Sequence, residues 1–260
     1  MIHAGAGGLQ TAAVRQRSLV LAALIVLAVA AWAAMLAQHR GMDDHDRMFT
    51  MGMGLPLFLV TWALMMAAMM LPAMSPMVDA FIRVQDDRRA AGNRYVPTAV
   101  FIAGYLVLWA ASGVLAFLPA RWLEDAAIDQ NWPMEETARF GGALIVAAGF
   151  YQLSSLKRMC LSKCRTPMAF IATSWREGGA GALRMGLEHG AYCLGCCWLL
   201  SVILFPLGIM NVAVMIAVTA LVFAEKVLPH GMRVAAVSGV ALVAYGMLVI
   251  AAPEALPTMM

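Results

Sequence analysis

Seven apolar stretches constrain the fold of this chain more than any other feature. They lie at 18–37, 55–77, 97–119, 140–156, 187–209, 212–228 and 234–252. A helix that crosses the hydrocarbon core of a bilayer needs about 20 predominantly apolar residues. The sequence therefore predicts an all-α fold, a polytopic membrane helix bundle with seven transmembrane helices that form a single transmembrane domain over residues 1–260.

The composition agrees with lipid as the surrounding solvent. Hydrophobic residues make up 62% of the chain and charged residues 13%, whereas a soluble domain is typically about 45–50% apolar and about 25% charged. The first stretch follows Arg15 and Arg17, as a secretory signal would. Its apolar run is too long for the usual signal peptide, so we expect a retained helix there.

Basic residues indicate how the helices are oriented. With seven helices and a cytoplasmic N-terminus, the cytoplasmic segments hold fourteen of the 18 Lys and Arg residues. Cytoplasmic loops of membrane proteins carry such an excess, so we expect the N-terminus inside and the protein in a bacterial inner membrane. Lipid is an expected partner. Nucleic acid is not, because no basic patch interleaved with aromatic residues is present.

Methionine is concentrated in the second stretch of a chain that contains 22 methionines. In the segment WALMMAAMMLPAMSPM, Met66, Met70 and Met74 share one face of an ideal helix, and Met69 lies beside them. Thioethers are soft ligands that suit Cu(I). Methionine also serves as a flexible apolar filler, and the sequence leaves both interpretations open.

Cysteine is concentrated in the fifth stretch, in the segment EHGAYCLGCCWLL. His189, Cys193 and Cys196 share one helical face, and Cys197 lies close to it. Neighbouring cysteines on one helix have poor geometry for a disulfide, and the cytoplasmic side is reducing. Three cysteines in five residues therefore favour metal binding or redox chemistry over simple packing.

Two further cysteines, Cys160 and Cys164, are one helical turn apart in the predicted cytoplasmic loop 157–186. Four basic residues surround them: Lys157, Arg158, Lys163 and Arg165. Nearby cations lower a thiol pKa and favour the thiolate. We therefore expect a reactive, accessible pair that accepts or delivers a metal at the cytoplasmic face.

The first outer loop mixes methionine, histidine and aspartate. His39, His45 and Met48 are its candidate metal ligands. Such a loop could collect a metal from outside, and an ordinary solvated loop explains the composition equally well.

The ligand types indicate which metal to expect. Thiolate and thioether ligands select Cu(I), whereas thioether is not among the usual ligands of zinc. Calcium and magnesium need oxygen ligands. Copper, as Cu(I), is therefore the expected metal, and haem is a less favoured cofactor.

Three stretches of the chain resemble a known family. They are MMAAMMLPAMSPM (65–77), LKRMCLSKCRTP (156–167) and, most specifically, GLEHGAYCLGCCWLL (186–200). The chain is similar over roughly residues 50–250 to bacterial proteins described as predicted metal-binding integral membrane proteins, whose domain has no established function and whose members are often labelled copper chaperones. The resemblance implies metal binding and a multi-helix membrane fold, and it implies no particular reaction.

We predict a Cu(I)-binding membrane protein that transports or hands over copper. The outer loop would capture the ion, Met66 and Met70 would pass it inward, and the cysteines would hold and deliver it. The chain lacks a GxxxxGK[ST] motif, so an ATP-driven mechanism is not expected. A copper donor or acceptor protein is an expected partner. The scheme also predicts that the second and fifth stretches touch along their sulfur-bearing faces.

Two other classes of protein remain open. A membrane redox enzyme could use the clustered cysteines with a haem, quinone or thiol partner, with His189 or His230 as an axial haem ligand. A membrane scaffold or assembly subunit could instead pack its Met and Gly faces against a partner complex. Whether the protein is an enzyme is not decided by the sequence. A non-enzymatic role is favoured, and we assign no catalytic residue.

Overall fold

The computed structural model describes residues 4–39, 50, 52–92, 95–209 and 211–257, and their regular structure consists of helices alone. The all-α prediction is confirmed for this part of the chain. The elements are α1 (Ala4–His39), α2 (Leu55–Ala90), α3 (Thr98–Asp129), α4 (Met134–Leu153), α5 (Ser155–Arg165), α6 (Pro167–Ser174), α7 (Gly178–Val202), α8 (Leu204–Leu207), α9 (Val212–Val227), α10 (Gly231–Ala251) and the short 3₁₀ helix η1 (Pro253–Ala255).

Within the described residues, five segments are long and apolar enough to cross a membrane. They are Arg17–Ala37 in α1, Leu55–Ala90, Thr98–Asp129, Gly178–Leu207 and Gly231–Ala251. The two other predicted spans correspond to α4, whose first turns carry charged residues, and to α9, which has 16 residues. Neither offers the apolar length of the other five. The fold is therefore a helical bundle of membrane character.

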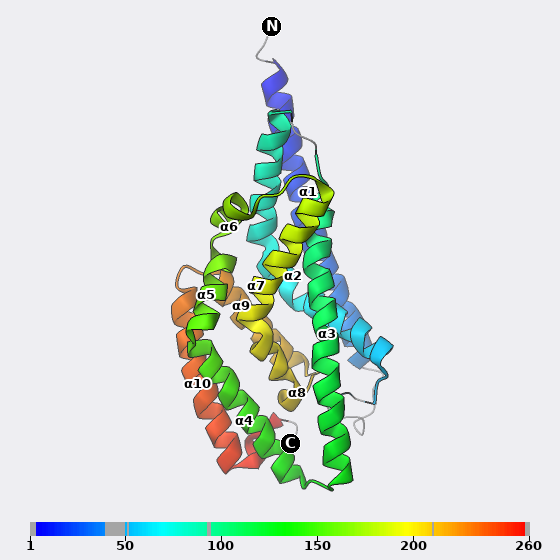
Figure 1. Ribbon diagram of the computed structural model, residues 1–260, viewed down its shortest axis with the longest axis vertical. Helices are drawn as coiled ribbons and strands as arrows, with labels where there is room; N and C mark the ends of the chain where they lie inside the picture. Colours follow the sequence, from blue (N-terminus) through cyan, green and yellow to red (C-terminus); the bar gives the residue numbers. More distant parts are fainter. Residues whose placement is uncertain (1–3, 40–49, 51, 93–94, 210, 258–260) are drawn as a thin grey trace.

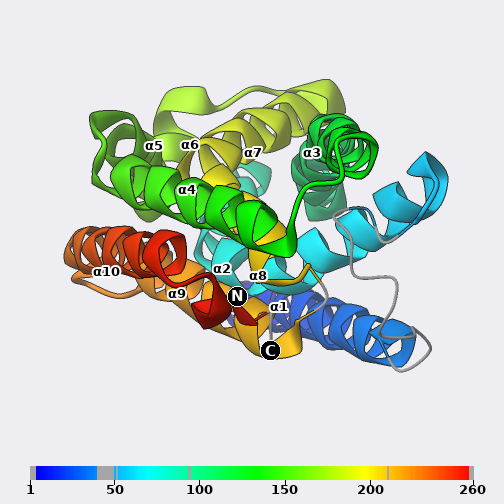
Figure 2. The same cartoon turned by 90° about the horizontal axis from the view of Figure 1, so that it is seen from below.

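The helices pack as an elongated bundle (Figures 1 and 2). Helix α2 packs against α1, α3 and α9, and α7 packs against α3 and α5. Helix α4 packs extensively against α10, and the two lie side by side in both views (Figures 1 and 2). Helix α7 is therefore surrounded by other helices along much of its length, and most of its polar side chains are shielded from the surroundings.

Small residues bring α3 and α7 unusually close together. A Cβ atom at Gly186 of α7 would collide with the backbone carbonyl of Phe101 in α3, and one at Gly104 would collide with that of Leu183. Small residues allow such close backbone approach between membrane helices. The contact matters for function because it places Tyr105 of α3 beside the cysteines of α7.

The predicted fourth span, 140–156, is interrupted at Ser154. Helix α4 ends at Leu153, Ser154 adopts an extended conformation, and its hydroxyl accepts a hydrogen bond from the amide of Lys157 at 3.1 Å. A side-chain oxygen at this position satisfies a free amide in the first turn of the next helix. The break lets α5 pack along α7, and residues 157–186, predicted as a cytoplasmic loop, are largely helical.

Candidate metal centre

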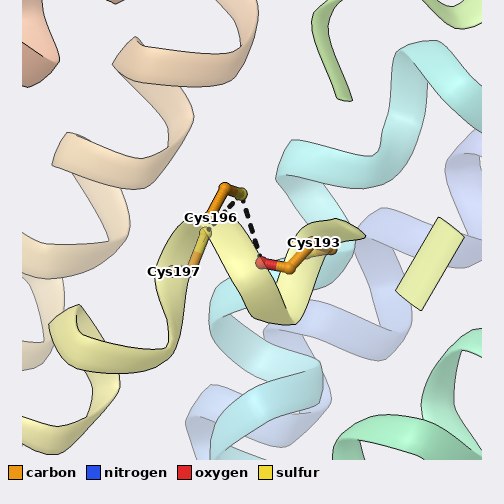
Figure 3. A group of neighbouring side chains, drawn as sticks. All are labelled: Cys193, Cys196 and Cys197. Atoms are coloured by element: carbon orange, nitrogen blue, oxygen red, sulfur yellow. Dashed lines mark hydrogen bonds between the residues drawn. The ribbon is translucent and has the colours of Figure 1, made fainter. Parts of the chain in front are cut away.

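Three cysteines of α7 form a compact group of thiols. The sulfurs of Cys193, Cys196 and Cys197 all lie within 4.8 Å of one another, and all three side chains are buried. The Sγ atoms of Cys196 and Cys197 are 3.1 Å apart, and the Cys196 thiol donates to the backbone carbonyl of Cys193 at 3.1 Å (Figure 3). The helical spacing of these residues thus brings three potential ligands together.

Helix α5 adds its two cysteines to this group. The Sγ of Cys164 lies 3.9 Å from that of Cys196. Cys160 faces Gly195, where an added Cβ would come within 2.8 Å of the Cys160 sulfur. We call the five residues Cys160, Cys164, Cys193, Cys196 and Cys197 the cysteine cluster. The expectation of a separate, accessible pair at the cytoplasmic face is wrong, because α5 packs on α7 and both of its cysteines are buried.

A lysine from a third helix enters the cluster. Lys226, at the end of α9, is buried and donates to the Cys193 sulfur at 2.8 Å. The hydroxyl of Tyr105 lies 3.0 Å from the same sulfur. Cys193 therefore has a cationic partner in Lys226 and neutral partners that include the Tyr105 hydroxyl. Sequence reasoning missed both residues, although an ionisable pair, Glu225 and Lys226, within an apolar stretch is a recognised signal of function.

Glu225, the residue before Lys226, does not pair with that lysine and instead forms a fully buried ion pair with Lys157. Its Oε2 accepts from Lys157 Nζ at 2.6 Å, and the two side chains are 1% and 0% exposed. Its Oε1 accepts from Gln152 at 2.7 Å. Because Glu225 is committed to Lys157, the positive charge of Lys226 is directed toward sulfur rather than toward its neighbour in sequence.

The basic residues of α5 do not activate its thiols. Lys157 pairs with Glu225, Arg165 donates to the backbone carbonyls of Glu225 and Pro229, and Arg158 and Lys163 are exposed. Burial raises the pKa of the Cys160 thiol. A hydrogen bond to Cys193 is the main cause that raises the pKa of the Cys164 thiol. The predicted lowering of these pKa values is therefore wrong.

His189 lies one turn before Cys193 but outside the group of three thiols. Its ring packs against Phe101, Tyr105 and Phe170, with centroids 6.2, 5.6 and 5.4 Å away. Its Nδ1 is buried without a hydrogen-bond partner. A haem on this histidine would require the surrounding rings to move. The orphaned nitrogen fits a ligand or donor role more readily. His230, the other residue considered for haem, is exposed at the start of α10.

The methionines of α2 are buried inside the protein rather than exposed to lipid. Met66, Met69, Met70 and Met74 are 0–2% exposed. The Ser201 hydroxyl of α7 lies 3.9 Å from the Met66 sulfur, one turn beyond Cys197. This contact joins the two sulfur-bearing helices beside the cysteine cluster, although α2 packs mainly against α1, α3 and α9.

The predicted outer capture site falls largely outside the part of the chain that the structure describes. His45 and Met48 belong to residues 40–49, which are not described, and His39 ends α1 with its side chain outside the described set. The structure therefore carries no statement about these three ligands.

The chemistry of the cluster suits a soft metal ion. Its donor atoms are sulfurs, and aromatic and aliphatic side chains surround it. The ammonium of Lys226 can balance negative charge on sulfur. Thiolate ligands suit soft metals, Cu(I) among them, and a buried charge must be paired. The residues present therefore fit bound copper.

Comparison with known proteins supports the same chemistry. A family model named PpoB2 and described as a copper chaperone matches residues 59–249. The chain belongs to this family. The resemblance inferred from the sequence is thereby confirmed, and the matched region of the PpoB2 family includes all five cysteines and the methionines of α2. Neither the curated proteins nor the solved structures contain a match to the chain.

Proposed function

We propose that this protein binds Cu(I) at the cysteine cluster and hands it to, or receives it from, a partner at a bacterial inner membrane. The observation that carries the proposal is the convergence of thiols from α5 and α7 at one buried point beside Lys226. Packing alone does not require cysteine at each of these positions. Membership of a copper chaperone family supports the same ion.

Within this scheme the five cysteines have different tasks. Cys193, Cys196 and Cys197 hold the ion, and Cys164 lies close enough to exchange with them. Cys160 lies against Gly195 of α7 and would be a further thiol that the ion can reach. The ion moves along weaker thioether ligands on the buried face of α2, which are Met66, Met69, Met70 and Met74. His189 supplies a nitrogen donor near the cluster.

The proposed topology has seven transmembrane helices and a cytoplasmic N-terminus. Helices α4 and α9 cross the membrane together with the five longer segments. Gln152 of α4 and Glu225 and Lys226 of α9 are buried against neighbouring helices, whereas the charged residues in the first turns of α4 are exposed. The excess of basic residues in the cytoplasmic segments supports this orientation. Copper would enter from the outer loop that carries His39, His45 and Met48.

Metal analysis of the protein purified in mild detergent under reducing conditions tests the proposal. We expect the wild type to bind Cu(I) stoichiometrically against a competing Cu(I) chelator. The variant with Cys193, Cys196 and Cys197 changed to serine should retain none, because a hydroxyl is a poor ligand for a soft ion. The matched control is Met159→Leu, which alters an exposed sulfur on α5. Undiminished copper in the triple variant would refute the assigned site.

A further inference from the structure

We propose that Lys226 determines the charge of the ion that the cysteine cluster accepts, so that the cluster favours monovalent over divalent soft cations. This inference rests on the proposed metal site and adds a selectivity residue to it. Lys226 is neither a metal ligand nor part of the sequence pattern that pointed to copper. Its role is inferred from its position at the end of α9, where its side chain contacts the thiols.

The first support is distance. The ammonium of Lys226 lies 2.8 Å from the Cys193 sulfur. A metal–thiolate bond is about 2.3 Å long, so an ion bound to Cys193 lies within about 5 Å of the ammonium nitrogen. Lys226 is 8% exposed, and little water is available to screen the repulsion between the two positive charges.

The second support is that, among the described residues, the acidic group next to Lys226 in sequence is already paired with another lysine. Glu225, adjacent in sequence, is held by Lys157 at 2.6 Å and Gln152 at 2.7 Å. The Tyr105 hydroxyl and the Cys164 thiol also contact Cys193, and neither is a carboxylate. The negative charge that balances Lys226 therefore resides on the thiolates, which also carry the metal.

The third step is electrostatic. A fixed positive charge repels a divalent ion twice as strongly as a monovalent ion in the same position. This ratio does not depend on how many thiolates hold the ion, so Lys226 lowers the affinity for a divalent ion more than that for a monovalent ion whether two or three of the cysteines ligate it.

The test compares the affinities of Ag(I) and Cd(II), two soft ions of different charge that do not change oxidation state. Each affinity is measured by competition with a thiol chelator, on protein in detergent. Lys226→Met removes the charge and keeps the length of the side chain. We expect the ratio of Ag(I) to Cd(II) affinity to fall on the order of a hundredfold.

Two matched variants separate charge from packing. Lys226→Arg keeps the charge and should keep the ratio within about threefold. Tyr105→Phe removes a neutral hydrogen bond to Cys193 without changing charge, so any loss of affinity should affect both ions equally. A ratio that falls equally in Tyr105→Phe and Lys226→Met would overturn the inference.

The remaining outcomes are also decisive. If Lys226→Met leaves the ratio unchanged while the triple cysteine variant loses both ions, the cluster is the metal site but Lys226 does not select for charge. If the triple variant binds both ions normally, the proposed function itself fails. Should Lys226→Met not fold, the wild-type ratio is compared with that of a small dithiol, and a wild-type preference for Ag(I) no greater than the dithiol's overturns the inference.

Discussion

The two sulfur-rich regions of this molecule both lie on buried helices but differ in the environment of their sulfur atoms. On α7 and α5, thiols converge to within 3.1–3.9 Å of their neighbours and meet a lysine and a tyrosine. On α2, the thioethers are equally buried but spread along one helix, and the Met66 sulfur meets only a neutral hydroxyl of α7 at 3.9 Å. Burial alone therefore does not distinguish a ligand set from core packing, whereas convergence and charge do.

The comparison can be extended to stability, because among the described residues the cysteine side holds a fully buried ion pair, Lys157–Glu225. Glu225→Gln leaves the Lys157 ammonium buried without its partner, and removing one member of such a pair costs about 3–5 kcal/mol. We expect that loss in the free energy of unfolding, measured by denaturant titration in mixed micelles. The corresponding change beside α2, Ser112→Ala, removes a neutral hydrogen bond from Trp62 and should cost about 1 kcal/mol.

The double variant Lys157→Met, Glu225→Leu provides the control for this prediction. Replacing both members of a buried ion pair by apolar side chains is often neutral or stabilising, so the double variant should recover most of the lost stability. Equal losses for Glu225→Gln and Ser112→Ala would show that the two regions are held together in the same way.

The sequence predicts much of the fold because solvent preference is encoded residue by residue. Apolar stretches of the right length predict membrane helices wherever the surroundings are lipid. The grouping of Cys193, Cys196 and Cys197 follows from the helical period alone. Both predictions depend on local spacing, which a single sequence contains.

The remaining parts of the site depend on long-range packing. Cys164 reaches Cys196 only because the helix is interrupted at Ser154 and α5 packs along α7. No local sequence pattern specifies the direction in which α5 leaves this break. Lys226 at the end of an apolar helix is equally well explained by a side chain that extends its charge toward the membrane surface. The inward orientation of Lys226 depends on the ion pair that Glu225 forms with Lys157, a residue 68 positions away in the sequence.

Within the cysteine cluster, the α5 thiols should react more slowly than their basic neighbours suggest. Burial raises the pKa of Cys160, so less thiolate is present at a given pH, and thiolate is the reactive form. At pH 8 we therefore expect its alkylation by maleimide to be slower than that of a free thiol. The rate should keep rising above the pH at which an ordinary thiol reaches its maximum.

A variant that retains Cys160 as its single cysteine isolates this measurement, and unfolded protein supplies the reference rate. The sign is fixed by the direction of the shift, since a raised pKa moves the whole rate profile to higher pH. A rate profile displaced to lower pH would mean that the basic residues of α5 do lower the pKa of the Cys160 thiol. The conclusion that burial controls the reactivity of this thiol would then be wrong.

The smallest effect is expected for the methionines, and it tests whether the two regions form one site. Met66→Leu with Met70→Leu conserves side-chain volume, and such exchanges usually cost less than about 1.5 kcal/mol. If the cysteines set the equilibrium and the methionines only conduct the ion, Cu(I) affinity should change by less than about threefold, because neutral thioethers bind more weakly than thiolates. The rate of copper loading in proteoliposomes should fall several-fold.

Met65→Leu, equally buried on the same helix, should leave that rate unchanged. A large loss of affinity in the double variant would make Met66 and Met70 part of the metal centre itself. An unchanged loading rate would restrict the α2 methionines to core packing.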